Sequence, residues 1–442
     1  MVVSSRNLLM LLGLGIVVGM SPRLADAQIP PGFEVIRLTD DPDMDGPPAI
    51  NNFGQVVWSK RIDQGFDTEE IFFFDGVEVR RITDDNIRDA FPDLNDFGTL
   101  VWSREKATGE TENFEIAMWR DGRMTLLTDN DVGDWGPTVN NRERVTWSHI
   151  SERGCFGLYL MFYDGSVTWQ LTDDDLSSQI PEINSSDEIA WVAFDFCQNP
   201  WMSTINMYSG GRLIELTDGE CQDSGTTVND RSQVAWGSGC PEFSGILLWA
   251  NGRTRRIIDA GLIPRINGRG TVAFTRFNLD TSILEQWLWV DGELLQLSDN
   301  GIPSWKGEIN DCGEVSWWFG DVPNLDIVLM RLKPGDATHD DIVSAEDFSL
   351  FDGCFSGPGD PDDVCKRSGS DVDRDGDVDL RDFVFREVQS QELEEMVDLI
   401  ECMTGPMDLD EFCACRALDI DHDRDVDLRD FASFQTLLRA SP

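Results

Sequence analysis

The sequence is poor in histidine, in basic residues and in long hydrophobic runs, and each shortage excludes a class of function. Only 3 of the 442 residues are histidine, and no Gly-x-Ser-x-Gly motif is present. Ser–His catalysis, Cys–His catalysis and histidine-based zinc sites therefore lack their residues. Lysine and arginine number 35 against 82 aspartate and glutamate residues, which gives a net charge of −47. This charge repels nucleic acid and anionic lipid surfaces, so neither is an expected partner.

A single long apolar run lies at the N-terminus, at residues 8–20, between Arg6 and the small residues Ala25 and Ala27. The run is shorter than the roughly 20 apolar residues of a membrane-spanning helix. Its flanks predict a signal peptide over residues 1–27 that is cleaved before Gln28. The mature chain is therefore expected to be secreted, in the extracellular space, in the periplasm or at the cell surface, without membrane insertion after cleavage.

In place of these features the sequence has a repeat of about 44 residues. A small or β-branched residue followed by Trp or Phe recurs seven times, and most repeats also carry a hairpin dipeptide such as Asp75-Gly76. Four short strands in such a length are typical of one propeller blade. Seven residues before each aromatic, in a phrase like Pro-x-Ile-Asn-x-x-Gly, stands a turn-forming asparagine: Asn51, Asn95, Asn140, Asn184, Asn229, Asn267 and Asn310.

The two ends of the array predict how the ring closes. The seventh repeat ends at residue 332 without a fourth strand, whereas residues 33–40 form a fourth strand with no blade before it. The N-terminal strand is therefore expected to pair with the third strand of blade seven. The Leu-Thr-Asp and Asp-Gly signatures of these repeats resemble those of the TolB-type propeller. The resemblance implies a mainly β fold, a seven-bladed β-propeller over residues 28–333, of a type that binds proteins or small ligands.

A second aspartate stands five residues after the Leu-Thr-Asp acid in four repeats. These residues are expected on the face where one blade crosses to the next, either as turn caps or as a cation or basic-ligand site. Trp135, Trp201 and Trp305 are candidates for the same face, where an indole either stacks on a sugar or peptide or packs in the fold. The four aspartates are Asp45, Asp89, Asp134 and Asp223.

The C-terminal residues 334–442 contain three Asp-rich segments of 12 residues. The middle segment has side-chain oxygens at positions 1, 3, 5, 9 and 12, a backbone carbonyl at position 7, and Gly376 at the turn, as a calcium loop requires. The predicted cofactor is Ca²⁺. The predicted ligands are Asp371, Asp373, Asp375, Asp377, Asp379 and Asp382, then Asp419, Asp421, Asp423, Asp425, Asp427 and Asp430, and in the first segment Asp336, Thr338, Asp340 and Asp347.

Each loop ends in Asp-Phe and has no helix before it, which resembles the dockerin module. The resemblance implies a small α-helical calcium-loop module that attaches to a protein partner such as a cohesin. Position 6 is Asp341 in the first loop and Arg424 in the last, where the pattern has glycine, so these two loops are expected to bind calcium more weakly. The residues implied to contact the partner stand at loop positions 10 and 11: Leu380, Arg381, Leu428 and Arg429.

The 10 cysteines of an exported chain predict disulfide bonds. Equal spacings predict two local bridges, Cys354–Cys365 and Cys402–Cys413. A bridge between Cys312 and Cys415 is expected to join the C-terminal module to the propeller. Four further cysteines are expected on one face of the propeller: Cys155 and Cys197, and Cys221 and Cys240.

Two functions are consistent with this organisation. The main prediction is an exported, non-catalytic calcium-binding protein whose propeller binds a protein or a glycan and whose C-terminal module attaches it to a surface. The alternative is a carbohydrate-active enzyme, a polysaccharide hydrolase or lyase that carries a dockerin-type tag. Close carboxylate pairs are certain to occur among 82 acidic residues, and such pairs cleave glycosidic bonds when their pKa values are shifted apart.

Overall fold

The computed structural model describes residues 29–343 with short gaps, and five residues near the C-terminus. The gaps are at 63–68, 86, 107–112, 152–156, 174–175, 197–201, 241–242, 335 and 337, and the five residues are Asp419, Ile420, His422, Asp430 and Ser433. The predicted signal peptide and most of the predicted C-terminal module therefore lie outside the described residues. No described helix is long and apolar enough to cross a membrane.

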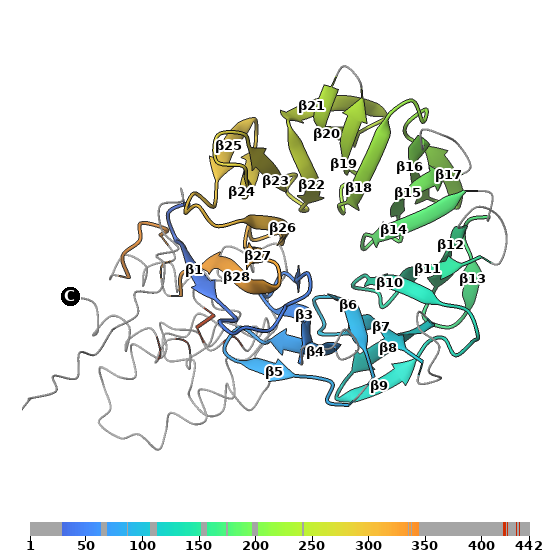
Figure 1. Cartoon of the computed structure of the whole chain (residues 1–442), viewed down its shortest axis with the longest axis horizontal. Helices are drawn as coiled ribbons and strands as arrows, with labels where there is room; N and C mark the ends of the chain where they lie inside the picture. Colours follow the sequence, from blue (N-terminus) through green and yellow to red (C-terminus); the bar gives the residue numbers. More distant parts are fainter. Residues whose placement is uncertain are drawn as a thin grey trace, which may run out of the picture.

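Seven antiparallel four-stranded sheets surround a central channel, so the described chain is the predicted seven-bladed propeller (Figure 1). Blade seven is β26–β28 with β1, and each other blade takes four consecutive strands. The strands are β1 (Phe33–Arg37), β2 (Ala49–Ile50), β3 (Val56–Arg61), β4 (Glu69–Phe74), β5 (Val79–Arg81), β6 (Asp89–Leu94), β7 (Leu100–Glu105), β8 (Phe114–Arg120), β9 (Arg123–Leu126), β10 (Asp134–Val139), β11 (Val145–Ile150), β12 (Leu158–Tyr163), β13 (Thr168–Gln170), β14 (Ser177–Ile183), β15 (Ile189–Asp195), β16 (Met202–Ser209), β17 (Arg212–Glu215), β18 (Gln222–Val228), β19 (Val234–Cys240), β20 (Phe243–Ala250), β21 (Arg253–Asp259), β22 (Gly261–Ile266), β23 (Val272–Asn278), β24 (Ile283–Val290), β25 (Glu293–Gln296), β26 (Ser304–Ile309), β27 (Val315–Asp321) and β28 (Asn324–Leu332).

The N-terminal strand closes the ring as the sequence predicts. β1 pairs antiparallel with β28, with Phe33 opposite Leu332 and Arg37 opposite Val328. The sheet order is β1-β28-β27-β26, so the first strand of the chain is the outer strand of the last blade. Because this pairing joins the two ends of the propeller, the ring is held by main-chain hydrogen bonds as well as by packing.

The hydrophobic core lies between neighbouring blades. The second strand of each blade is buried on both faces, which explains the continuous apolar run that ends in Trp or Phe. One cluster, for example, joins Val57 and Ile71 of blade one to Leu100 and Trp102 of blade two. Each blade therefore buries its apolar surface only by stacking on the next, as expected for a repeat architecture.

The turn asparagines form a closed ring at one end of the channel. The Nδ2 of each donates to the backbone carbonyl of the next blade's asparagine at 2.8–3.0 Å. Asn310 of blade seven donates to Asn51 of blade one at 2.9 Å and completes the circle. Each asparagine also caps its own turn, as Asn95 Oδ1 does by accepting the backbone N–H of Phe97 and of Thr99. The repeated asparagine therefore joins blades as well as forming turns.

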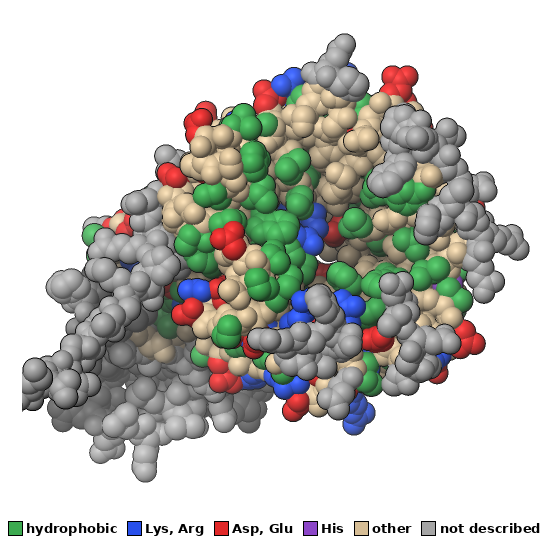
Figure 2. All heavy atoms as spheres, viewed as in Figure 1, with side chains coloured by type: hydrophobic (Ala, Val, Ile, Leu, Met, Phe, Trp, Pro, Cys, Tyr) green, Lys and Arg blue, Asp and Glu red, His purple; other side chains and the backbone are tan. Residues whose placement is uncertain are grey.

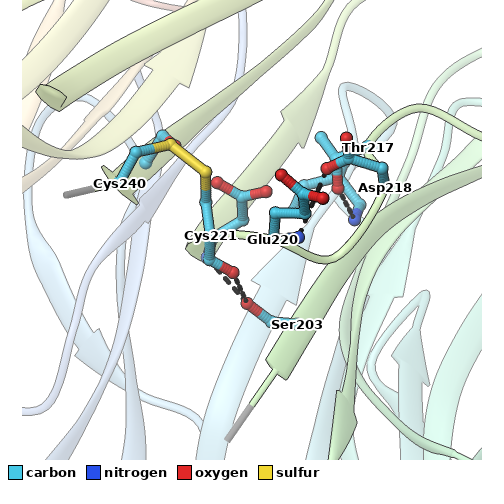
Figure 3. The surroundings of a disulfide bond; sticks show 9 residues. Ser203, Thr217, Asp218, Glu220, Cys221 and Cys240 are labelled. Carbon is cyan, nitrogen blue, oxygen red and sulfur yellow. Dashed lines mark hydrogen bonds between the residues drawn. A yellow bond between two sulfur atoms is a disulfide. The ribbon is translucent and has the colours of Figure 1, made fainter. Parts of the chain in front are cut away.

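The disulfide between Cys221 and Cys240 spans blade five, with Cα atoms 4.6 Å apart (Figure 3). Ser203 supports it, since its hydroxyl donates to the Cys221 carbonyl at 3.3 Å. Cys312 is also disulfide-bonded, and its partner is one of the seven cysteines that lie outside the described residues. The bridge from Cys312 to Cys415 stays a prediction. The Cys221–Cys240 bond is consistent with an oxidising, extracytoplasmic environment.

Candidate functional site

A cavity with a volume of about 1010 Å³ opens at the end of the channel away from the asparagine ring. Residues from the inner strands of blades one to four line much of its wall, and Arg265, Lys306 and Glu308 enter from blades six and seven. Figure 2 shows hydrophobic side chains around the central opening with basic and acidic side chains at its centre. An apolar entrance with converging polar groups is the usual form of a ligand site.

Four of the five charged residues that line the cavity occupy one position of the repeat, two residues before the turn asparagine, and the fifth is Lys306. This position is Asp93 in blade two, Glu182 in blade four, Arg265 in blade six and Glu308 in blade seven. The other three blades carry a neutral residue there: Ala49, Thr138 and Thr227. The propeller's symmetry therefore brings three acids and one arginine, far apart in sequence, to the same channel.

A bulge in six of the seven inner strands precedes this position. The β6–β7 register shifts between Ala90 and Asp93, and five further inner strands shift at the equivalent point. Three bulge residues, Phe91, Ile180 and Lys306, have φ of 54°, 53° and 57°. Left-handed φ is costly for residues with a Cβ, and such strain is commonly retained at functional sites.

Arg265 is the centre of the charge cluster. Its Nε donates to both carboxylate oxygens of Glu308, at 2.7 and 2.8 Å, and its Nη2 lies 3.5 Å from Glu182 Oε1. Asp93 accepts the backbone N–H of Val139 at 2.8 Å. Lys306 Nζ lies 5.2 Å from the centre of the Trp318 ring. The five residues, named here the channel cluster, carry three carboxyl groups and two cationic groups.

Burial shifts the pKa values of the three carboxyl groups and of the lysine in the channel cluster toward neutral pH. Desolvation raises the pKa of Glu182 to about 8 and that of Asp93 to about 7, and the Arg265 charge opposes the rise at both. Desolvation also raises the pKa of Glu308 and lowers that of Lys306 to about 8. Proton transfer near neutral pH is most effective for groups with such pKa values.

Aromatic and aliphatic side chains form the entrance of the cavity. Phe91 is 42% exposed and Ile180 is 51% exposed, and both line the cavity together with Trp135. The Trp135 ring lies 6.0 Å from that of Phe91 and 4.4 Å from that of Phe114. Trp135 is thus a candidate stacking platform. Trp305 packs on Trp318 at 4.7 Å, and Trp201 lies outside the described residues.

The aspartates predicted at the blade crossings are structural in three blades. Asp45, Asp89 and Asp134 are fully buried, and each accepts the indole N–H of its own blade's core tryptophan, at 3.0, 2.7 and 2.7 Å. Asp45 also joins blades, because its backbone carbonyl accepts the Trp318 indole N–H at 3.0 Å. Their role is thus to satisfy buried indole groups and to hold blades together.

One group of carboxylates with metal-like spacing is found among the described residues: Glu70, Asp85 and Asp89. Arg104 already binds Asp85 at 2.6 Å and Asp89 at 2.7 Å, and Arg81 binds Glu70 at 3.1 Å. The two guanidinium groups neutralise most of the charge that a metal ion would need. We therefore interpret this group as an ion-pair network between blades one and two.

Few of the predicted calcium ligands are described. Asp336 is buried and accepts the backbone N–H groups of Asp340 and Asp341. In the last loop Asp419 and Asp430 are buried, and Asp430 accepts the N–H of Ile420, which brings the two ends of that loop together. Thr338 and Asp340 are described and exposed. The remaining ligands and the partner-contact residues Leu380, Arg381, Leu428 and Arg429 lie outside the described residues, as do the predicted helices apart from Asp430 and Ser433.

Solved structures share the fold but not the sequence. An oligogalacturonate lyase from Vibrio parahaemolyticus has a TM-score of 0.53 at 9% identity, over 69% of this chain and 98% of that one. The β-propeller domain of the Trilobed protease from Pyrococcus furiosus has a TM-score of 0.50 at 12% identity, over 66% and 94%. A puromycin-hydrolyzing peptidase from Mycobacterium tuberculosis has a TM-score of 0.50 at 11% identity, over 69% and 54%, so this chain spans about half of that peptidase's length.

No family model matches the sequence, and no curated protein matches it. The TolB-type and dockerin resemblances therefore stay predictions. The prediction of a non-catalytic protein is corrected. It rested on the missing Ser–His and Cys–His groups, whereas the lyase is matched over almost its whole length, so there the propeller itself is the enzyme. At these identities the likeness shows the fold alone: a seven-bladed propeller of a kind found among enzymes.

Proposed function

We propose that the chain is a carbohydrate-active enzyme, a polysaccharide hydrolase or lyase, whose active site is the channel cluster. The observation that carries the proposal is the convergence of Asp93, Glu182 and Glu308 on one wide cavity, with pKa values raised by burial. Glycosidic bonds are cleaved by carboxyl groups of unequal acidity, one of which donates a proton while the other accepts one. Neither histidine nor a nucleophilic serine is needed.

The pKa values and contacts assign the roles. Glu182, with its pKa at about 8, is protonated at neutral pH and donates a proton to the leaving oxygen. Asp93, with its pKa at about 7, is partly ionised and is the base, which activates water in a hydrolase or removes a ring proton in a lyase. Arg265, fixed by Glu308, stabilises negative charge that develops near Glu182. Trp135 and Phe91 stack on sugar rings at the entrance.

The test is cleavage of a panel of neutral and uronate-containing polysaccharides by the purified protein. A lyase product has an unsaturated sugar that absorbs ultraviolet light, whereas a hydrolase releases reducing ends without that absorbance. We expect Glu182→Gln and Asp93→Asn each to reduce turnover by about 100-fold or more. Glu78→Gln is the matched control, since Glu78 is exposed at a hairpin of blade one. An inactive wild-type protein, or two fully active channel variants, contradicts the proposal.

The C-terminal loops extend the proposal to location and attachment. We propose that the chain is secreted and that its Asp-rich loops bind calcium and serve as a dockerin-type tag for the enzyme. Oxygen ligands from aspartate at alternate positions match the preference of calcium for six to eight oxygens. Calorimetric titration of the full chain with calcium measures this directly. Absence of heat and of a chelator-sensitive change in circular dichroism contradicts calcium binding.

A further inference from the structure

The residues that follow β28 run back along the start of β1, where the ring closes. Lys333 N–H donates to the Gly32 carbonyl at 2.8 Å, and Gly32 N–H donates to Asp341 Oδ1 at 3.2 Å. Lys333 Nζ also donates to the Asp341 backbone carbonyl. In Figure 1 this segment is the orange trace beside the blue strand β1. Lys333 and Asp341 thus bind both main-chain groups of Gly32, and the described residues from 333 to 342, which leave out 335 and 337, are named here the clamp segment.

The clamp segment contains the described start of the first Asp-rich loop, whose first residue is a buried carboxylate. Asp336 is 0% exposed, and its two oxygens accept the N–H groups of Asp340 at 3.1 Å and Asp341 at 2.9 Å. Thr338 and Asp340 stand at the next two ligand positions. The oxygens of these three residues fit calcium in their chemistry, and the fold of the segment determines where Asp341 lies.

Asp341 stands where a calcium loop normally has glycine, and the structure gives a reason. Its φ is 69°, a conformation that is unfavourable for a residue with a Cβ. Glycine would adopt this φ without cost, but it could not supply the carboxylate that binds Gly32 N–H. From the sequence alone, Asp341 is an unfavourable residue at a loop position that normally holds glycine. The contact with Gly32 indicates that this residue connects the loop to the propeller.

The last loop contacts the propeller in a parallel way. His339 and His422 are the fourth residues of the first and last loops, and both have left-handed φ, 58° and 60°. A Cβ added to Gly32 would lie 2.5 Å from His339 Cβ, and one added to Gly76 would lie 3.1 Å from His422 Cγ. Gly76 borders the closing seam, because its carbonyl accepts Arg331 Nη1 of β28 at 3.2 Å. Each loop therefore places its fourth residue on a propeller glycine.

We propose that the first and last Asp-rich loops dock on their own propeller at the seam between blades seven and one, and that the first loop keeps the ring closed when it holds calcium. Calcium held by Asp336, Thr338 and Asp340 would fix the segment from which Asp341 reaches Gly32. An ion that binds only the folded clamp stabilises every contact that depends on it. Calcium binding then stabilises the pairing of β1 with β28, and this pairing in turn strengthens calcium binding. This inference rests on the calcium binding proposed above and is independent of any activity in the channel.

Hydrogen exchange of the full chain tests the clamp at β1. In calcium we expect the amides of Phe33–Arg37 to exchange about tenfold more slowly than in chelator, because opening of the seam then requires release of the ion. Amides of β10 and β11, on blade three, are the internal reference and should not respond. Equal exchange of the β1 amides in calcium and in chelator overturns the calcium dependence.

The Asp341→Gly variant distinguishes the clamp from a defect hypothesis, in which Asp341 only weakens calcium binding by the loop. Glycine removes the strain at φ 69° and restores the usual loop residue, so a defect hypothesis predicts tighter calcium binding and slower exchange of β1. The clamp predicts faster exchange of β1, by several-fold, whatever happens to calcium affinity. His339→Gly should act in the same direction, and Ser282→Gly, at an exposed residue with φ 59° in blade six, is the matched control. Slower β1 exchange in Asp341→Gly overturns the clamp.

Discussion

At the residue scale, the unusual feature of the propeller is the number of acids held away from water. Burial raises the pKa of Asp45, Asp89 and Asp93 to about 7 and that of Glu182 to about 8. The same groups have pKa values of about 4 in an unfolded chain. Through these four acids the folded protein therefore binds more protons than the unfolded chain between about pH 4 and pH 8.

The consequence is a stability that falls as pH rises. Since the unfolded chain binds fewer protons between about pH 4 and pH 8, the free energy of unfolding decreases across that window, by on the order of 1 kcal/mol per pH unit for each such group. Urea denaturation at pH 5, 6, 7 and 8 measures the slope. Glu182→Gln should make it shallower, and Glu78→Gln should leave it unchanged. A stability that increases toward pH 8 contradicts the assignment.

The channel cluster also shows where sequence reasoning stopped. The phrase Pro-x-Ile-Asn-x-x-Gly predicts a turn from its asparagine, but a single repeat assigns no role to the variable residue before Ile. That residue is Asp93, Glu182, Arg265 or Glu308 in the four charged blades. Alignment of the seven repeats on the asparagine would have revealed one charged column. Burial and pairing across the ring depend on closure, so the sequence could not supply them.

At the scale of the strand and the blade, the pairing of aspartate with tryptophan was predicted only in part. The spacing placed Asp45, Asp89 and Asp134 at the blade crossings, where the structure has them. Their bonds to the core indoles were not expected, because the bulge that aligns the two side chains is invisible in a periodic pattern. The asparagine ring was likewise predicted only as a set of turns.

Two tryptophans allow the indole bond to be measured. Trp102 Nε1 donates to Asp89 at 2.7 Å, whereas Trp317 Nε1 has no partner among the described residues, and both rings are buried. Replacing either tryptophan by phenylalanine removes a similar volume. Only Trp102→Phe also removes a hydrogen bond, the one that the Asp89 carboxylate accepts. We expect Trp102→Phe to cost about 1 kcal/mol more than Trp317→Phe in chemical denaturation. Equal costs would show that the bond adds nothing to stability.

At the scale of the whole molecule, the feature that the sequence predicted best is closure. Unequal strand counts at the two ends were enough to place β1 on β28, because a closed ring requires every blade to be complete. The residues that line the cavity and the contacts of Asp341 and His422 with the propeller were not predicted, although a Cys312–Cys415 bridge between the C-terminal module and the propeller was. Both depend on contacts between residues that only the closed ring brings together.

Two equivalent proline substitutions test how much the closure of the ring by β1 contributes to stability. Leu38 N–H donates to Ile327 O and Ile82 N–H donates to Ile71 O, each at 2.8 Å, at the same position of blades seven and one. Proline removes one such bond in either case. Leu38→Pro acts on the strand that joins the two ends of the propeller, so it should lower the melting temperature more than Ile82→Pro, measured by calorimetry. A larger effect of Ile82→Pro would show that closure by β1 is not the limiting contact.

The origin of blade seven also fixes the order in which the molecule can be completed. β1 is made near the beginning of synthesis and β28, its partner, only after the six other blades. Until then β1 has unpaired main-chain groups along one edge, which invite pairing with another chain. Blades one to six can fold as they are made, but the ring cannot. Completion therefore awaits the last propeller strand, and a chain truncated before residue 324 is left with a permanently unpaired first strand.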